Sequence, residues 1–354
     1  MNEWKTVRLG DVCEIVMGTS PEGNTISQNT SDGIEFHQGK TCFGNLYLNE
    51  SGMFTNAPVK FAEAGNVIMS VRAPVGDSNI TPRKIAIGRG LCTFNTKTDF
   101  EKLFLYYYLN SQIEYLKSKS TGSTFKAVNK YVISDLKIPL PPLAEQKHIA
   151  AILDKTQKII AEHKQMLQKY DTLIKSRFIE MFGDNNFQKK KWNEIFITKT
   201  GKLDSNAMVE DGEYPFFTCA KEVFKIDKYA FDQEALLLAG NNAAGKYDVK
   251  HYKGKFNAYQ RTYVLSLKEE WEYPLFKYQL EDKLEYLRQQ SLGGLTKYLT
   301  LKILETLDFI VPPIELQKEF STFVQQIDKS KSAVQKSLEK TETLYKSLMQ
   351  QYFG

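Results

Sequence analysis

The chain has 354 residues, of which 42% are apolar and 25% charged, a composition typical of a soluble globular protein with room for two domains. No apolar run reaches the roughly 18 residues of a membrane span, and the charged N-terminus lacks the apolar centre of a signal peptide. We therefore expect a cytoplasmic protein without membrane contact. Cys13, Cys42, Cys92 and Cys219 lie too far apart for a zinc site and are expected to be reduced. The net charge of +5 permits a polyanionic partner without indicating one.

Strands are predicted to dominate residues 1–140, which are rich in β-branched and aromatic residues punctuated by Gly and Asn. The exception is the segment 103–116, where the apolar spacing predicts a helix. The features that recur later in the chain are, in order, Trp4 with the apolar stretch 7–16, a strand entering a Gly-containing turn at 67–76, a Gly/Ser loop at 120–126 and a strand that ends in Pro141-Pro142.

A long helix is predicted after Pro142, which suits a first helical turn. From Ile149 to Met181 the apolar residues alternate at spacings of three and four, the pattern of a coiled-coil seam. Glu145 lies in the first turn, where a negative charge interacts favourably with the helix dipole, and Gly183 is a suitable terminator. A helix of about 40 residues is roughly 60 Å long.

The whole arrangement is repeated. The segment Leu136-Lys-Ile-Pro-Leu-Pro-Pro-Leu-Ala-Glu-Gln-Lys147 returns as Leu307-Asp-Phe-Ile-Val-Pro-Pro-Ile-Glu-Leu-Gln-Lys318 at an offset of 171 residues, which then holds without a gap through the helix. Trp4 is matched with Trp192 at an offset of 188, so the second front half is expected to be 17 residues shorter (188 − 171). A variable front half and a constant back half suggest that the front varies with a target while the back maintains a fixed geometry.

A second long helix is predicted after Pro313, with an apolar stripe from Phe320 to Met349. Because neither helix can bury its stripe alone, we expect the two to pack against each other as a coiled coil. The packing is antiparallel if the second globular domain returns to the far end. The alternative is two separate helices, each packed on its own domain. Ile160, Leu167 and Ile174 extend beyond a single seam, and we expect them to be exposed for partner subunits or for self-association of the isolated chain.

The predicted fold is mixed α/β (α+β) with an internal pseudo-two-fold repeat. Two globular domains are joined by two long antiparallel helices. The expected boundaries are 1–140 for the first globular domain, 141–183 for its helix, 184–311 for the second globular domain and 312–354 for the second helix.

With this order of motifs, duplicated over essentially the full chain, the sequence resembles the specificity subunit of type I restriction-modification systems. The loops Ser120-Thr-Gly-Ser-Thr-Phe-Lys126 and Ser291-Leu-Gly-Gly-Leu-Thr-Lys297, the Pro-Pro strand ends and the helices after them carry the resemblance. It implies two target recognition domains, each for one half of a split double-stranded DNA site, and helices that set their separation. The chain is shorter than is usual for that family, and its second recognition domain is compact.

The resemblance also implies partners. Two methyltransferase subunits and the restriction subunits would assemble with this chain, which is itself non-catalytic. S-adenosylmethionine, and ATP with Mg²⁺, would be bound by those partners, and no cofactor is expected in this chain.

Side chains suited to DNA follow the matched strands. Base edges are recognised by Arg, Lys, Asn and Gln, and phosphates by Lys, Arg and hydroxyl groups. Matched positions exchange Arg for Asn or Gln, as two different half-sites require. The residues predicted to contact bases or a groove are Arg72, Arg89, Asn241, Asn242, Gln260 and Arg261. Those predicted to contact the DNA backbone are Thr124, Lys126, Lys130, Lys246 and Lys297. The alternative is that these groups only satisfy local turns or surface salt bridges.

Catalytic signals are weak. Gly240-Asn-Asn-Ala-Ala-Gly-Lys246 matches the start of a P-loop, but Tyr247 replaces the required Ser or Thr and the following residues are expected to be extended. The two Pro-Pro pairs lack the Asn or Asp and the Tyr of an amino-methyltransferase loop. The leading alternative to DNA recognition is therefore a coiled-coil scaffold with protein-binding end domains, ahead of a stand-alone DNA enzyme.

Overall fold

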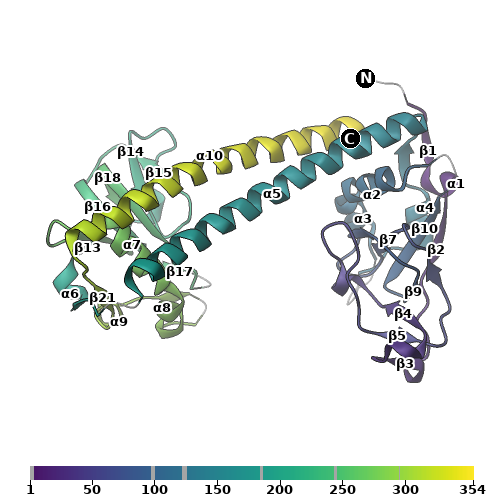
Figure 1. Cartoon of the computed structure of the whole chain (residues 1–354). Helices are drawn as coiled ribbons and strands as arrows, with labels where there is room; N and C mark the ends of the chain where they lie inside the picture. Colours follow the sequence, from purple (N-terminus) through teal and green to yellow (C-terminus); the bar gives the residue numbers. More distant parts are fainter. Residues whose placement is uncertain (1–3, 97–99, 122–125, 184–185, 243–244, 295) are drawn as a thin grey trace. The chain divides into compact units, whose positions relative to one another are not determined.

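The structure is a computed structural model that describes residues 4–96, 100–121, 126–183, 186–242, 245–294 and 296–354. It contains two compact units, and each takes part of two 40-residue helices, α5 (Leu143–Phe182) and α10 (Ile314–Phe353) (Figure 1). Unit 1 comprises residues 1–164 and 336–354, and unit 2 comprises residues 165–335. These units divide both helices, whereas the boundaries expected from the sequence follow the covalent repeat and stay a prediction.

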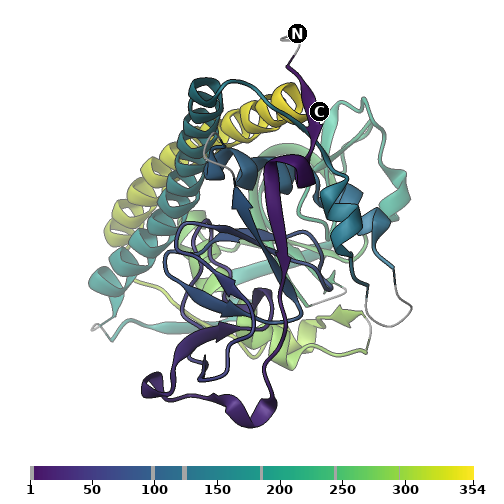
Figure 2. The ribbon, with the colours of Figure 1, turned by 90° about the vertical axis from the view of Figure 1, so that its right-hand side faces the viewer.

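Unit 1 is built mainly from strands, drawn in purple and blue in Figure 2. A four-stranded sheet has the order β2-β10-β7-β8, a five-stranded sheet has the order β3-β5-β4-β9-β6, and β1 pairs with β11. The strands are β1 (Thr6–Arg8), β2 (Cys13–Met17), β3 (Ile26–Ser27), β4 (Ile34–His37), β5 (Phe54–Thr55), β6 (Phe61–Ala62), β7 (Val67–Ser70), β8 (Ser78–Ile80), β9 (Ile85–Ile87), β10 (Leu91–Thr96) and β11 (Lys137–Pro139).

Short helices pack beside these sheets. They are α1 (Leu9–Val12), α2 (Lys102–Ser111), α3 (Ile113–Lys119) and α4 (Lys130–Ser134), with the 3-10 turns η1 (Gly23–Thr25), η2 (Thr30–Asp32) and η3 (Lys40–Cys42). The helix predicted at 103–116 is thus confirmed, in two pieces. Its apolar run from Phe104 to Leu109 is buried against β7 and β8, which explains why it carries so few polar residues.

Unit 2 has a six-stranded sheet in the order β13-β19-β16-β18-β14-β15 and two pairs, β12-β21 and β17-β20. The strands are β12 (Lys189–Lys191), β13 (Phe196–Thr200), β14 (Tyr214–Phe217), β15 (Phe224–Ile226), β16 (Phe231–Ala239), β17 (Asn241–Asn242), β18 (Val249–Ala258), β19 (Thr262–Leu267), β20 (Lys297–Tyr298) and β21 (Asp308–Ile310). The helices are α6 (Trp192–Ile195), α7 (Tyr273–Asp282), α8 (Leu284–Gln290) and α9 (Leu301–Leu304), with the 3-10 turn η4 (Ser205–Ala207).

The two units repeat the same pairing, but the expected match of Trp4 with Trp192 is wrong. Thr6 pairs with Pro139, and Lys189 pairs with Ile310 in the equivalent ladder, so the first strands of the front halves correspond at an offset of 183. Trp192 therefore corresponds to Leu9, and both are fully buried at the start of a short helix. Either side chain can fill one apolar position, which is why residue identity misled the alignment. The second front half is shorter by 12 residues (183 − 171), not 17.

Within each unit, α5 and α10 run antiparallel, as the seam predicts. In unit 1, Lys164 of α5 is 2.9 Å from Glu342 of α10. In unit 2, Arg177 is 2.6 Å from Glu319, and Asp171 is 2.5 Å from Lys331. Residue numbers therefore increase along α5 where they decrease along α10. The described residues include no helix that is long and apolar enough to cross a membrane.

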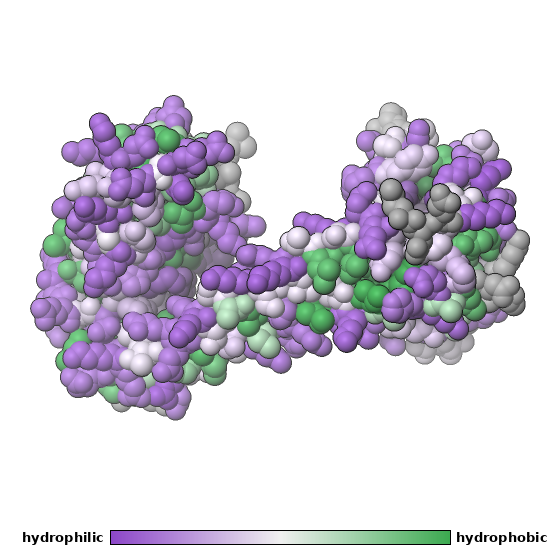
Figure 3. Space-filling model, turned by 90° about the horizontal axis from the view of Figure 1, so that it is seen from above, coloured by the Kyte–Doolittle hydropathy of each residue, from purple (hydrophilic) through white to green (hydrophobic). Residues whose placement is uncertain are grey.

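The expected exposure of Ile160 and Ile174 is wrong, because both are buried, at 6% and 8%, while Leu167 is half-buried. Ile174 packs with Phe320 and Val324 of α10, since the seam turns toward those residues. The helices instead expose other apolar side chains, Met166, Leu173, Ile179 and Leu344. Figure 3 shows apolar side chains, in green, gathered on one stretch of the helical surface.

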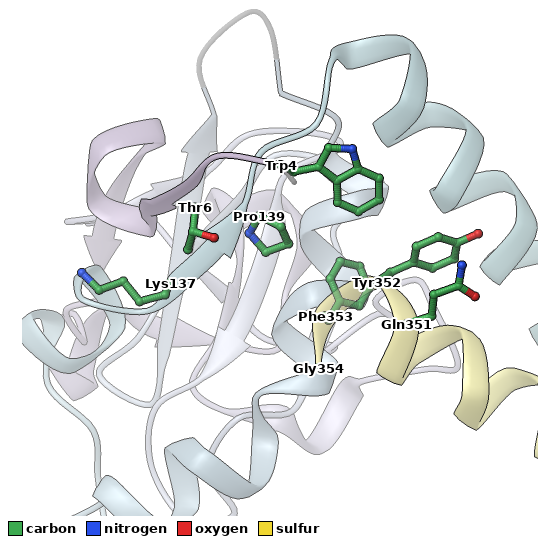
Figure 4. Close-up of a pocket in the computed structure, with 8 residues that line it drawn as sticks. All are labelled: Trp4, Thr6, Lys137, Pro139, Gln351, Tyr352, Phe353 and Gly354. Atoms are coloured by element: carbon green, nitrogen blue, oxygen red, sulfur yellow. The ribbon is translucent and has the colours of Figure 1, made fainter. Parts of the chain in front are cut away.

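The end of each long helix packs beside the first strand of a unit. In unit 1, Trp4 stacks on Tyr352 with ring centroids 6.4 Å apart, beside a pocket of about 550 Å³ between β1, β11 and the end of α10 (Figure 4). Unit 2 has a pocket of about 430 Å³ at the equivalent place, where Phe187 packs against Phe182 at the end of α5. The duplication thus includes the anchoring of the helix ends.

A buried glutamine anchors the start of each long helix. The side chain of Gln146 accepts a hydrogen bond from the Glu101 N–H (2.9 Å) and donates to the Pro141 carbonyl (2.9 Å). Gln317, its equivalent at an offset of 171, bonds Glu272 and Pro312 in the same way, at 3.1 and 2.8 Å. Each glutamine is only 1% exposed, so no water replaces these partners readily.

We predict that Gln146→Met destabilises unit 1. The similar size of Met preserves packing, but a buried N–H and a buried carbonyl lose their partners, at a cost of about 1–3 kcal/mol each. Urea unfolding of the full chain measures the loss. Gln168→Met, at an exposed position on the same helix, is the matched control and should leave the midpoint unchanged. Equal midpoints for the two variants would contradict the anchoring role.

A second buried polar cluster lies in unit 1. Glu35 accepts hydrogen bonds from the Ser51 N–H (2.7 Å) and from Arg83, and its carboxylate is 3.0 Å from His37 Nε2. Burial alone would raise the pKa of Glu35, but the Arg83 and Ser51 hydrogen bonds and the positive charge nearby outweigh it and lower the pKa to about 2. Burial also lowers the pKa of His37, against the attraction of Glu35.

We predict that unit 1 loses stability in acid. A group whose pKa is lower in the folded chain favours folding above its ordinary pKa, and the benefit is lost as the pH falls. For Glu35 this loss of stability runs from pH 4.5 to about 2. The loss that comes from protonation of His37 begins as the pH falls below 6.5. Hydrogen-exchange protection of β4 and β9 should fall over this range. In Glu35→Gln the fall below pH 4.5 should be smaller, and an identical pH profile would refute the assignment.

Candidate nucleic-acid interface

Three segments of unit 1 that are far apart in sequence meet where β7 ends. The Val71 N–H donates to the Gly90 carbonyl (2.9 Å), which joins the end of β7 to the turn before β10. The Ala73 N–H donates to the Lys126 carbonyl (2.9 Å), and the Val128 N–H donates to the Val71 carbonyl (3.0 Å). These backbone bonds bring Arg72, Arg89 and Lys126 to one surface, which we call the strand-end surface of unit 1.

The same bonds recur in unit 2. The Gly240 N–H donates to the Arg261 carbonyl (2.8 Å), and the Leu299 N–H donates to the Gly240 carbonyl (2.8 Å). In the short ladder of β17 with β20, Asn241 lies opposite Tyr298 and Asn242 lies opposite Lys297. The strand-end surface of unit 2 therefore comprises Asn241, Asn242, Gln260, Arg261 and Lys297.

In each unit, a glycine packs against the backbone next to the strand-end surface. Gly18, after β2, and Gly201, after β13, approach the backbone at the end of β9 and of β18 so closely that no side chain fits. A Cβ at Gly18 would lie 2.2 Å from the Gly88 carbonyl oxygen, and one at Gly201 would lie 1.8 Å from that of Ala258. The turns that carry Arg89 and Gln260 are thereby held against the rest of each unit.

The predicted contact residues are open to solvent to different degrees. Asn241, Asn242 and Lys297 are half-buried, and Thr124 lies outside the described residues. The exposed ones are Arg72, Arg89, Lys126, Lys130, Lys246, Gln260 and Arg261. Lys130 begins α4 just beyond the strand-end surface of unit 1, and Lys246 donates its N–H to Asn242 Oδ1 (3.2 Å) beside that of unit 2.

The alternative to DNA contact is that these residues satisfy local turns or surface salt bridges. Across the described residues, no carboxylate forms an ion pair with Arg72, Arg89, Lys126, Lys130, Lys246, Arg261 or Lys297. Surface salt bridges therefore do not explain these cations. Asn242 does satisfy a local turn, through its bond to the Lys246 N–H. The surfaces thus present cations without anionic partners, as a polyanion site needs.

Two polar residues beside Arg89 were not predicted. Ser20 Oγ accepts the Arg89 N–H (3.2 Å) and donates to Gln38 Oε1 (2.8 Å). The Gly90 N–H donates to the Gln38 carbonyl (3.1 Å). Ser20 is 69 residues from Arg89 in the chain, so no local pattern in the sequence indicates that they meet.

The weak catalytic motifs have structural explanations. After Lys246 the chain enters the strand β18, not a helix, so no helix N-terminus faces the supposed P-loop. Pro142 accepts the Glu145 and Gln146 N–H groups (2.9 and 3.0 Å) at the start of α5, which makes the first Pro-Pro pair a strand-to-helix junction. Within the described part of the chain, no three His, Cys, Asp or Glu side chains are grouped to hold a metal ion.

Comparison with known proteins agrees with the duplication. The model of the family described as type I restriction modification DNA specificity domain matches residues 1–169 and again residues 184–342. The putative type I restriction enzyme MjaX specificity subunit of Methanocaldococcus jannaschii is 40% identical over 176 residues, which cover 47% of this chain and 40% of that protein. The type I restriction enzyme EcoDI specificity subunit of Escherichia coli is 37% identical over 149 residues, which cover 40% of this chain and 32% of that protein. The chain thus matches less than half the length of these relatives.

A solved structure shares the fold. The type I restriction-modification system S subunit from M. genitalium superposes with a TM-score of 0.70 at 19% identity, over 100% of this chain and 97% of that one. The expected mixed α/β fold with two repeated domains and long helices is confirmed. The relatives are named specificity subunits, which agrees with the expectation of a non-catalytic chain. The chain belongs to the family of type I restriction modification DNA specificity domains.

Proposed function

We propose that this chain is the subunit that recognises DNA in a type I restriction-modification complex, with one half of a split, asymmetric site bound by each unit. The observation that carries the proposal is the duplicated strand-end surface. Its backbone pairing is the same in both units, whereas its side chains differ. A duplicated frame with different side chains suits two different half-sites.

The side chains at matched positions have different base preferences. Arg72 occupies the place of Asn241, because each lies opposite the equivalent bridge partner, Ala127 or Tyr298. Arg forms paired hydrogen bonds with guanine in the major groove, whereas Asn forms them with adenine. Arg89 and Gln260, which also occupy matched positions, differ in the same base preference, guanine for Arg and adenine for Gln. We infer that Arg72, Arg89, Asn241, Asn242, Gln260 and Arg261 contact bases or a groove.

The lysines around each surface suit a different role. Lys126, Lys130, Lys246 and Lys297, together with Thr124, are proposed to contact the DNA backbone, which positions the units without selecting a sequence. Lysine presents a compact charge that binds phosphate without the paired geometry of arginine.

The remaining chemistry is assigned to partners. We propose that two methyltransferase subunits, and restriction subunits in the complete enzyme, assemble with the long helices. S-adenosylmethionine and ATP with Mg²⁺ would be bound by those subunits, and this chain would hold no cofactor. The methylated base would be flipped out of the duplex into the methyltransferase. The helices, about 60 Å long, would act as a spacer between the half-sites.

The first prediction from this proposal concerns specificity. In the complex with its methyltransferase, Arg72→Ala should weaken binding by about 1–3 kcal/mol and relax selectivity within one half-site only, because a base contact is lost. Arg261→Ala should do the same within the other half-site. Mapping of methylated adenines on random-sequence DNA measures the change of selectivity for each of the two variants.

Lys126→Ala is the matched control, since it removes one charge from the same surface. It should lower affinity evenly for all sequences and reduce the salt slope by about one. Loss of methylation without any change of selectivity in Arg72→Ala and Arg261→Ala would contradict base recognition. A chain that neither binds DNA nor copurifies with a methyltransferase would favour the scaffold alternative.

The second prediction concerns the spacer. Four residues inserted after Lys164 in α5 and four after Gln335 in α10, where the compact units divide the helices, should lengthen the gap between half-sites. One helical turn adds about 6 Å, or roughly two base pairs. An insertion in α5 alone is the control and should abolish methylation by mismatching the helix pair. Retained methylation with unchanged spacing in the double insertion would refute the spacer role.

A further inference from the structure

Beside the edge strand β13, unit 2 has a groove of about 650 Å³ that the sequence analysis did not predict. It is lined by Lys199, Thr200, Lys202, Phe231, Tyr263 and Leu301, among others. Phe231 and Tyr263 form apolar walls, while both lysines are exposed.

The groove is continuous with the strand-end surface of unit 2. Lys202 is followed by Leu203, whose carbonyl accepts the Gln260 N–H (2.9 Å). On the other side, the Tyr263 hydroxyl donates to the Leu299 carbonyl (3.0 Å), and Leu299 bonds Gly240. The groove and the surface therefore share two segments of backbone.

In the described part of the chain, neither Lys199 nor Lys202 is held by an ion pair. Lysine on an edge strand can serve to prevent edge-to-edge pairing of sheets. This explains Lys199 in β13, but not Lys202, which lies beyond the end of the strand.

Unit 1 lacks the same charges. The first strands of the two units are related by an offset of 183. At this offset Lys199 corresponds to Val16, and Lys202 corresponds to Thr19. These two positive charges therefore have no counterpart at the matched positions of unit 1.

We propose that this groove holds a stretch of the DNA phosphate backbone, with Lys199 and Lys202 bound to phosphates next to the half-site of unit 2. The inference rests on the proposed function, because it extends the same DNA surface. It gives unit 2, the shorter front half, a contact through two lysines that the matched positions of unit 1 lack. Two exposed lysines that line the same groove as the exposed Thr200 suit contact with phosphates.

The test uses the full chain with its methyltransferase, bound to duplex DNA that carries the mapped site. Lys199→Ala with Lys202→Ala should reduce the salt slope of binding by about two and lower the affinity by about tenfold. Ethylation interference should disappear at one or two phosphates, all on the side of unit 2. Sequence selectivity should not change. Lys268→Ala, at the opposite end of β19, removes an exposed charge from the same unit and should leave the slope unchanged.

Two further variants keep the result interpretable. Lys202→Ala alone leaves β13 intact and should reduce the slope by about one, so a folding defect of the double variant does not decide the matter. Arg261→Ala reports on the proposed function itself. If Arg261→Ala alters DNA recognition while the lysine variants keep the wild-type slope, the groove proposal is overturned and the proposed function stands. If the Arg261 variant also binds like the wild type, the proposed function of unit 2 fails.

Discussion

The structure depends on one constraint, the backbone pairing between the turn that follows a buried strand and the segment that precedes the short helix α4 or α9. In unit 1 this pairing joins residues 71–73 to residues 126–128, and in unit 2 it joins residues 240–242 to residues 297–299. Main-chain hydrogen bonds do not depend on the side chains they carry. The side chains on these segments are therefore free to differ while their positions are fixed, as the exchange of Arg72 for Asn241 shows.

Each long helix is tied to its front half by the same principle. Gln146 and Gln317 are buried, and each bonds both the segment before a helix of the globular part and the carbonyl before its own helix. The first turn of the long helix is thereby fixed relative to α2 or α7. A rigid junction of this kind is what a spacer requires, because a flexible one would not transmit helix length to the distance between half-sites.

The two units differ in the length of their front halves and in the residues at matched positions. The offset of 171 holds for every equivalent hydrogen bond around the helix starts, but the first strands of the two front halves match at 183. The twelve missing residues, and Lys199 and Lys202 in place of Val16 and Thr19, alter the surface of unit 2 without altering its frame. We infer that the two units are adapted to different half-sites, by different side chains and by different extents of backbone contact.

The sequence by itself determined the duplication, the two long helices and the antiparallel seam, because these follow from residue periodicity and from a constant offset. It also identified the turns that carry Arg72, Asn241 and Lys297, since strand ends with glycine are local signals. Only the tertiary structure decided which residues share a surface, because the Ser20 hydroxyl and main-chain bonds between distant segments bring Arg89 and Lys126 together. It also corrected the match of Trp4 with Trp192 and the exposure of Ile160 and Ile174. Burial depends on which neighbour faces a side chain, and the identity of the residue alone does not specify that neighbour.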